Sequence, residues 1–154
     1  MLLLHLSDVD EDRWSARLAA KLDGYPIVRR GGQFDPGDVR YIFVWKPLED
    51  AFDGLNNLKA VLSLGAGVDA LLRHPRLPDG VPIVRFVDEE LTQCMTDYVV
   101  ANVTMHQRCH SRYVADQTAR RWTQFYPAPA WDISVGIMGL GELGRAAAEK
   151  LPSR

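Results

Sequence analysis

Three glycines near the end of the sequence have the spacing of a phosphate-binding turn. Gly139, Gly141 and Gly144 form the pattern G-x-G-x-x-G directly after the apolar residues 135–138. The first glycine permits a tight turn, the second leaves room for a pyrophosphate beside the backbone, and the third lets the next helix pack closely. The N–H groups of that helix's first turn would then face the phosphates. The predicted cofactor-binding residues are Gly139, Leu140, Gly141, Glu142, Leu143 and Gly144.

The residues around these glycines support a nucleotide turn over a chance tight turn. An apolar strand precedes them, and the strong helix formers of residues 145–150 follow. A whole βαβ unit needs about 30 residues, and the residue that selects NAD or NADP follows the glycines by roughly 20. Only ten residues follow Gly144 here. We therefore expect an incomplete dinucleotide-binding fold.

A second turn of small residues, Gly65, Ala66 and Gly67, follows the apolar run 59–64 and precedes a helical stretch. Backbone N–H groups in such a turn are unobstructed by side chains and can hold a carboxylate. The alternative is a tight strand-to-helix turn that binds nothing. The residues themselves favour neither possibility.

The rest of the sequence contains the elements that would position these turns. Apolar runs alternate with helical stretches, which predicts an α/β fold with a doubly wound parallel sheet. The predicted strands are residues 2–6, 27–28, 41–45, 59–64 and 83–86, the first helix covers residues 11–22, and a later strand covers residues 135–138.

The longest helical pattern covers residues 90–122, with apolar residues at spacings of three and four. A helix of this length exceeds what one small sheet needs. It would connect two domains, pack against a second subunit, or do both. Residues 123–131, with two prolines, are the expected linker into the glycine-bearing strand.

Composition excludes several functional classes. The chain has 154 residues, 47% hydrophobic and 25% charged, which suits a globular protein of one ordinary domain and a further stub. A net charge of −2 gives no reason to expect nucleic-acid or membrane partners, and no stretch is long enough to span a bilayer. Cys94 and Cys109 lack disulfide or metal spacing, so we expect free thiols in a reducing cytoplasm. His106 and His110 lie four residues apart but have no third ligand, so no metal site is expected.

Four motifs together resemble a known family. They are residues 64–69, the run Val44-Trp45-Lys46-Pro47, Met95 with Tyr98, and residues 135–144. In this order and spacing, the chain resembles the D-isomer-specific 2-hydroxyacid dehydrogenases of the glyoxylate/hydroxypyruvate reductase A type. The resemblance extends to about Leu151.

This resemblance implies a domain plan and a substrate site. Residues 1–90 would form a flavodoxin-like substrate domain, 91–131 a long interdomain and dimerisation helix with its linker, and 132–154 the start of an NAD(P)-binding Rossmann domain. A small 2-keto or 2-hydroxy acid would place its carboxylate on the turn of Gly65, Ala66 and Gly67, with Trp45 and Met95 shaping the pocket wall. The resemblance also implies NAD(H) or NADP(H) as the cofactor. A homodimer is expected from the apolar length of the helical stretch 90–122 and from the apolar surface that an incomplete cofactor domain would leave uncovered.

In this family the catalytic Arg, acidic residue and His lie beyond the glycine motif. None has a counterpart in this sequence, so we expect no catalytic residue and no activity from the chain alone. A β-branched residue at Gly67 is expected to crowd the bound anion and to strain the backbone.

Two other functions stay open. One is a flavodoxin-like or receiver-like binding module without a redox role. Receiver domains have acids near the first strand, and Asp8, Asp10, Glu11 and Asp12 fit that pattern. However, the third strand ends in Trp45 and Lys46 rather than in the aspartate that such a module phosphorylates. The long helix also suits a non-catalytic dimerisation module.

Overall fold

The structure, a computed structural model, describes residues 1–151. The described residues divide into two units, Met1–Val87 and the residues from Asp88 onward. No helix among the described residues is both long enough and apolar enough to cross a membrane.

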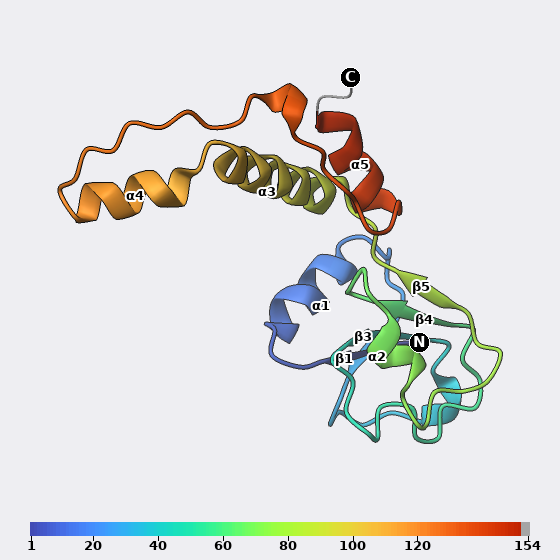
Figure 1. The fold of residues 1–154 in the computed structure, drawn as a ribbon. Helices are drawn as coiled ribbons and strands as arrows, with labels where there is room; N and C mark the ends of the chain where they lie inside the picture. The colour runs from blue at the N-terminus through green and yellow to red at the C-terminus, as the bar shows by residue number, and fades with distance from the viewer. Residues whose placement is uncertain (152–154) are drawn as a thin grey trace. The chain divides into compact units, whose positions relative to one another are not determined.

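A five-stranded parallel sheet forms the centre of the first unit. Its strands lie in the order β2-β1-β3-β4-β5 (Figure 1). This is the flavodoxin-like order, in which the chain changes direction between β1 and β3. The predicted α/β class with a doubly wound parallel sheet is therefore confirmed. The strands are β1 (Leu2–Leu6), β2 (Ile27–Arg29), β3 (Tyr41–Trp45), β4 (Ala60–Ser63) and β5 (Ile83–Arg85).

Apolar side chains from the strands and the adjacent loops make the core. The fully buried ones with the largest volumes are Leu4, Ile42, Val39, Val44 and Val61. Burial of one such side chain contributes roughly 1.5–3 kcal/mol. Four consecutive residues of β1 are buried, so this strand is covered on both faces, as parallel strands usually are, whereas buried and partly exposed residues alternate in β3 and β4.

Helix α1 (Glu11–Ala19) begins at Asp10, whose side chain accepts a hydrogen bond from the backbone N–H of Arg13 at 2.9 Å. The helix ends earlier than residue 22, where the sequence pattern placed its end. The chain turns at Asp23 and Gly24, which have φ values of 42° and 78°. This unit also contains the 3-10 helix η1 (Pro36–Asp38) and the short helix α2 (Asp69–Leu72).

The prediction of one helix over residues 90–122 is wrong. The second unit has two helices there, α3 (Glu89–Gln107) and α4 (His110–Thr118). Cys109 lies between them in the left-handed region, with φ 53° and ψ 39°, and its N–H donates to the carbonyl of His106 at 3.0 Å. A left-handed residue ends a helix. Because no glycine or proline marks this position, the sequence pattern continued through it.

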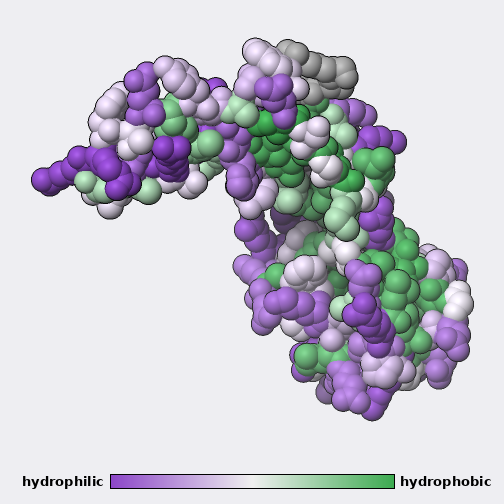
Figure 2. Space-filling model, viewed as in Figure 1, coloured by the Kyte–Doolittle hydropathy of each residue, from purple (hydrophilic) through white to green (hydrophobic). Residues whose placement is uncertain are grey.

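The expected strand at residues 135–138 is not formed within the described chain. These residues follow η2 (Ala130–Asp132) and precede α5 (Glu142–Lys150) without pairing to a neighbouring strand. A strand requires a partner for its N–H and C=O groups. Val135 is 46% exposed, and Figure 2 shows apolar residues at the surface of this unit near α3 and α5. Helix α5 packs against α3.

Candidate functional site

The turn that follows β4 lies at the carboxyl edge of the sheet, where doubly wound folds bind their ligands. Ser63, the last residue of β4, is buried and anchors the first residue of the turn. Its hydroxyl accepts a hydrogen bond from the N–H of Gly65 at 3.2 Å and donates to the Gly65 carbonyl at 3.1 Å. One side chain therefore fixes both polar groups of Gly65.

The next three backbone N–H groups, those of Ala66, Gly67 and Val68, are unpaired. Within residues 1–151 none of them donates a hydrogen bond. Helix α2 begins directly afterwards, and no side chain of the described chain caps it. Consecutive unpaired N–H groups in a turn form a concave donor surface that suits an anion such as a carboxylate.

Trp45 and Gly65 are in close contact. A Cβ atom added to Gly65 would lie 2.7 Å from Cζ3 of Trp45, so glycine is required for the ring to lie over this turn. The two residues come from adjacent strands, because β3 pairs with β4. The structure thus brings together the predicted site residues of the first unit: Trp45, Gly65, Ala66 and Gly67.

Gly67 differs from what the sequence led us to expect. Its backbone is not in the left-handed region, and a Cβ added there would meet no atom within 4 Å. The expected backbone strain of a larger residue is therefore wrong for the protein by itself. Only crowding of a bound anion remains as a reason for glycine at this position.

Met95, the fifth predicted substrate-site residue, belongs to the second unit. It lies on α3 and is 37% exposed. Its contribution to the pocket wall stays a prediction.

The glycine motif meets each of the three geometric requirements of a phosphate turn. Gly139 has φ 88°, which favours glycine, and a Cβ on Gly141 would point into open space. A Cβ on Gly144 would lie 1.9 Å from the carbonyl oxygen of Gly139, so the start of α5 is packed directly on the turn. Gly141 is the N-cap of α5, and within the described residues no side chain caps this helix. The N–H groups of Glu142, Leu143 and Gly144 are therefore available to a phosphate.

The similarities to known proteins agree with this geometry. No family model matches the chain. Glyoxylate/hydroxypyruvate reductase A of Yersinia enterocolitica is 37% identical over 145 residues, which cover 90% of this chain and 46% of the reductase. A D-isomer specific 2-hydroxyacid dehydrogenase from Xanthobacter autotrophicus, solved with NADPH and MES, has a TM-score of 0.87 and 37% identity and covers 98% of this chain and 50% of its own.

A glyoxylate/hydroxypyruvate reductase from Sinorhizobium meliloti, solved with NADP and sulfate, has a TM-score of 0.83, is 37% identical, and covers 97% of this chain and 48% of its own. The resemblance to the D-isomer-specific 2-hydroxyacid dehydrogenases is confirmed. The chain spans about half the length of the curated relatives it matches.

Two histidines of the first unit hold the loop after β3 through hydrogen bonds to Leu48. The Nε2 atom of buried His5 accepts from the N–H of Leu48 at 3.2 Å, and Nε2 of His74 lies 2.9 Å from the Leu48 carbonyl. Nδ1 of His74 accepts a hydrogen bond from the N–H of Arg76. Nε2 of His74 is therefore the ring nitrogen that donates a hydrogen bond to the Leu48 carbonyl. Burial lowers the pKa of His5, and the positive charge of Arg30 lowers it further. The lowered pKa favours the neutral form of the His5 ring, and hydrogen bonds with both rings hold Leu48 in place.

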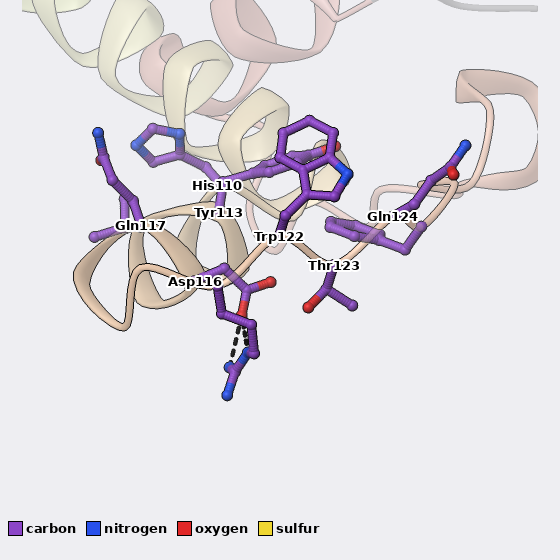
Figure 3. Close-up of a pocket in the computed structure, with 10 residues that line it drawn as sticks. His110, Tyr113, Asp116, Gln117, Trp122, Thr123 and Gln124 are labelled. Atoms are coloured by element: carbon purple, nitrogen blue, oxygen red, sulfur yellow. Dashed lines mark hydrogen bonds and ion pairs between the residues drawn. The ribbon is translucent and has the colours of Figure 1, made fainter.

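The cavity of about 500 Å³ beside α4 contains none of the predicted site residues (Figure 3). Asp116 lies in its wall with little exposure and accepts hydrogen bonds from Arg121 at 2.9 and 2.6 Å, which hold the pKa of that carboxyl below its usual range. The pair ties the end of α4 to the segment that follows it. Elsewhere too, no three metal-ligating side chains of residues 1–151 come together.

Two residues near the turn were not recognised from sequence. Ser63 is a polar residue at the end of an apolar strand, two positions before a glycine, and that pattern was an available signal. Arg85 lies at the end of β5, the strand next to β4, and donates from Nη1 to the Ala66 carbonyl at 3.4 Å. No local sequence pattern indicates this contact.

Proposed function

We propose that this chain is part of an NAD(P)-dependent reductase of small 2-keto acids such as glyoxylate or hydroxypyruvate, and that it supplies the site for the substrate carboxylate. The observation that carries the proposal is the set of unpaired N–H groups at Ala66, Gly67 and Val68. Trp45 covers one side of the turn. Met95 would complete the pocket wall, as the resemblance implies.

The proposed cofactor is NADP(H) or NAD(H), bound through its pyrophosphate to residues 139–144. Support comes from the open position at Gly141, the start of α5 without a side-chain cap, and two similar solved structures, which contain NADPH or NADP. The bound nicotinamide would supply the hydride. The chain's own share is to hold the phosphates by backbone N–H groups and the substrate by its carboxylate.

Reduction of a 2-keto acid also needs a proton donor and a cation near the carbonyl. By resemblance these groups belong to the part of the reductase beyond the glycine motif, so this chain alone is proposed to be inactive. We also propose that it binds NAD(H) or NADP(H) weakly or undetectably, because residues 135–138 pair with no strand of the described chain and, by resemblance, the ribose contacts come from residues beyond the glycine motif. Titration calorimetry that gave micromolar affinity for the 154-residue chain would contradict this.

A chimera tests the function directly. Residues 1–144 would be continued by the corresponding downstream half of the Yersinia enterocolitica reductase, and oxidation of NADPH by glyoxylate would be followed by absorbance. Gly67→Val is expected to raise KM and lower kcat/KM by at least about tenfold, which is roughly 1.4 kcal/mol. Because the Gly67 position is open, the variant should fold as well as the parent chimera.

Gly67→Ala serves as the graded comparison, with a smaller loss expected. An equally stable Gly67→Val chimera with unchanged kcat/KM would show that the turn is only structural. A folded parent chimera without glyoxylate reductase activity would refute the proposed function itself.

Homodimerisation is a second proposal. The segment after α4 exposes Trp122 by 93% and Tyr126 by 85%, which is unusual for large aromatic side chains. Light scattering is expected to give a dimer, and replacement of both aromatics by serine should shift it toward monomer. Leu72→Ser, at a 60% exposed apolar position in the first unit, is the control. A monomer at high protein concentration would contradict the proposal.

Cytoplasmic location stays part of the proposal. It rests on Cys94 and Cys109, which are both free thiols. Exposure of these thiols to a thiol reagent in intact cells and in lysates would test it.

A further inference from the structure

Two of the three carbonyl groups of the candidate anion turn accept hydrogen bonds from the end of β5. The Gly65 carbonyl accepts from the N–H of Phe86 at 3.3 Å, and the Ala66 carbonyl accepts from Nη1 of Arg85 at 3.4 Å. Arg85 is the register partner of Ser63 across β4 and β5. The last residues of two neighbouring strands therefore hold the same turn.

This attachment fixes where the unpaired N–H groups point. In a trans peptide the C=O and N–H groups point in opposite directions, and the described chain contains no cis peptide. The carbonyl of Gly65 shares its peptide with the N–H of Ala66, and the carbonyl of Ala66 shares its peptide with the N–H of Gly67. Because both carbonyls face the end of β5, both N–H groups point away from it.

Arg85 also brings charge to the turn. Its guanidinium carries a positive charge, and within the described residues no carboxylate forms an ion pair with it. A cation on the Ala66 carbonyl polarises the Ala66–Gly67 peptide and makes the Gly67 N–H a stronger donor. The same positive charge attracts an anion to the turn.

We propose that Arg85 is a positioning residue of the anion site, which holds the Ala66–Gly67 peptide with its N–H outward and strengthens carboxylate binding by its charge. This inference rests on the proposed function, since it assumes that the turn binds a carboxylate. It adds a residue from β5 that acts through the backbone of the turn rather than by contact with the substrate.

The test is an NMR titration of the 154-residue chain with sodium oxalate, at constant ionic strength, with sodium chloride as the blank. The amide signals of Ala66 and Gly67 are expected to shift saturably. Arg85→Met should raise the dissociation constant about tenfold. Arg85→Lys keeps the charge and should recover part of that loss, and the affinity of Arg85→Met should depend less on salt than that of the parent.

Arg40→Met is the matched control, because Nη1 of Arg40 donates to the Asn57 carbonyl at the same 3.4 Å, but before the start of β3 and β4, whereas the turn follows the end of β4. It should bind oxalate as the parent does. If the parent chain itself shows no saturable shift at Ala66 and Gly67, the proposed carboxylate site fails. Two results would overturn the role of Arg85 while the carboxylate site stands. In the first, the parent binds oxalate and Arg85→Met binds it equally well. In the second, Arg85→Lys binds oxalate as weakly as Arg85→Met does, and the salt dependence of the affinity is the same as in the parent.

Discussion

Gly144→Ala is expected to destabilise α5, although alanine is the better helix former. In a helix interior the change from glycine to alanine alone would stabilise by about 1 kcal/mol. Here the new Cβ would lie 1.9 Å from the carbonyl oxygen of Gly139, a backbone atom that cannot rotate away. The start of α5 or the turn must move by more than an ångström, and overpacking of this kind costs about 1–3 kcal/mol or more.

The net effect is expected to be a loss of up to about 2 kcal/mol, which raises the population of the locally opened state by up to roughly 30-fold. Amide hydrogen exchange of the 154-residue chain measures it directly, at the N–H groups of Ala146, Ala147 and Ala148 in α5. Local exchange is the suitable assay because the chain has two units and global unfolding need not be two-state.

Gly141→Ala is the matched control. Gly141 has φ −73°, and an added Cβ would meet nothing within 4 Å, so the change should stay within about 0.5 kcal/mol. Slower exchange in Gly144→Ala than in the parent would mean that helix propensity outweighs the contact. In that case the argument that α5 is packed on the glycine turn is refuted.

Three further outcomes are expected. Leu4→Ala removes a fully buried side chain from β1 and should lower the free energy of unfolding of the first unit by about 2–5 kcal/mol in urea titrations; a loss below 1 kcal/mol would contradict the burial. Asp88→Ala removes the side chain that caps α3 by accepting a hydrogen bond from the Leu91 N–H at 2.9 Å, and it should destabilise the start of the helix by about 1 kcal/mol. Amide hydrogen exchange in the first turn of α3 should become faster, and unchanged exchange would show that the cap is dispensable. Because the pKa of His5 is lowered on folding, the unfolded chain binds a proton at a higher pH than the folded chain does. The contribution of His5 to stability is therefore complete above about pH 6.5 and is lost as the pH falls below that value. His5→Gln should remove this part of the pH dependence of the free energy of unfolding, and an unaltered pH profile would assign it to other groups.

The sequence by itself determined the class of the fold and the glycine turn. Continuous apolar runs in β1, β3 and β4 are typical of strands covered on both faces, and their alternation with helical stretches predicts a parallel sheet. The spacing of Gly139, Gly141 and Gly144 predicts three distinct steric roles, and the structure has the corresponding geometry at each position. Local patterns suffice here because each role depends on residues close in the chain.

The break between α3 and α4 was decided by the conformation of one residue. Cys109 adopts the left-handed region at a position where the sequence contains no glycine, asparagine or proline. Residues 135–138 show the same limit for strands. Their apolar pattern is that of a strand, but a strand forms only when a neighbour supplies hydrogen-bond partners, and the described chain has none paired there.

The difference between Gly65 and Gly67 also came only from tertiary structure. Both are glycines of one short motif, yet Gly65 lies under the ring of Trp45 while Gly67 faces open space. The contact joins residues twenty positions apart, and its cause is the pairing of β3 with β4. Arg85 reaches the turn in the same way, from the end of the next strand. Sequence patterns predict which residues form each strand, but the order of strands in the sheet decides which side chains meet at its edge.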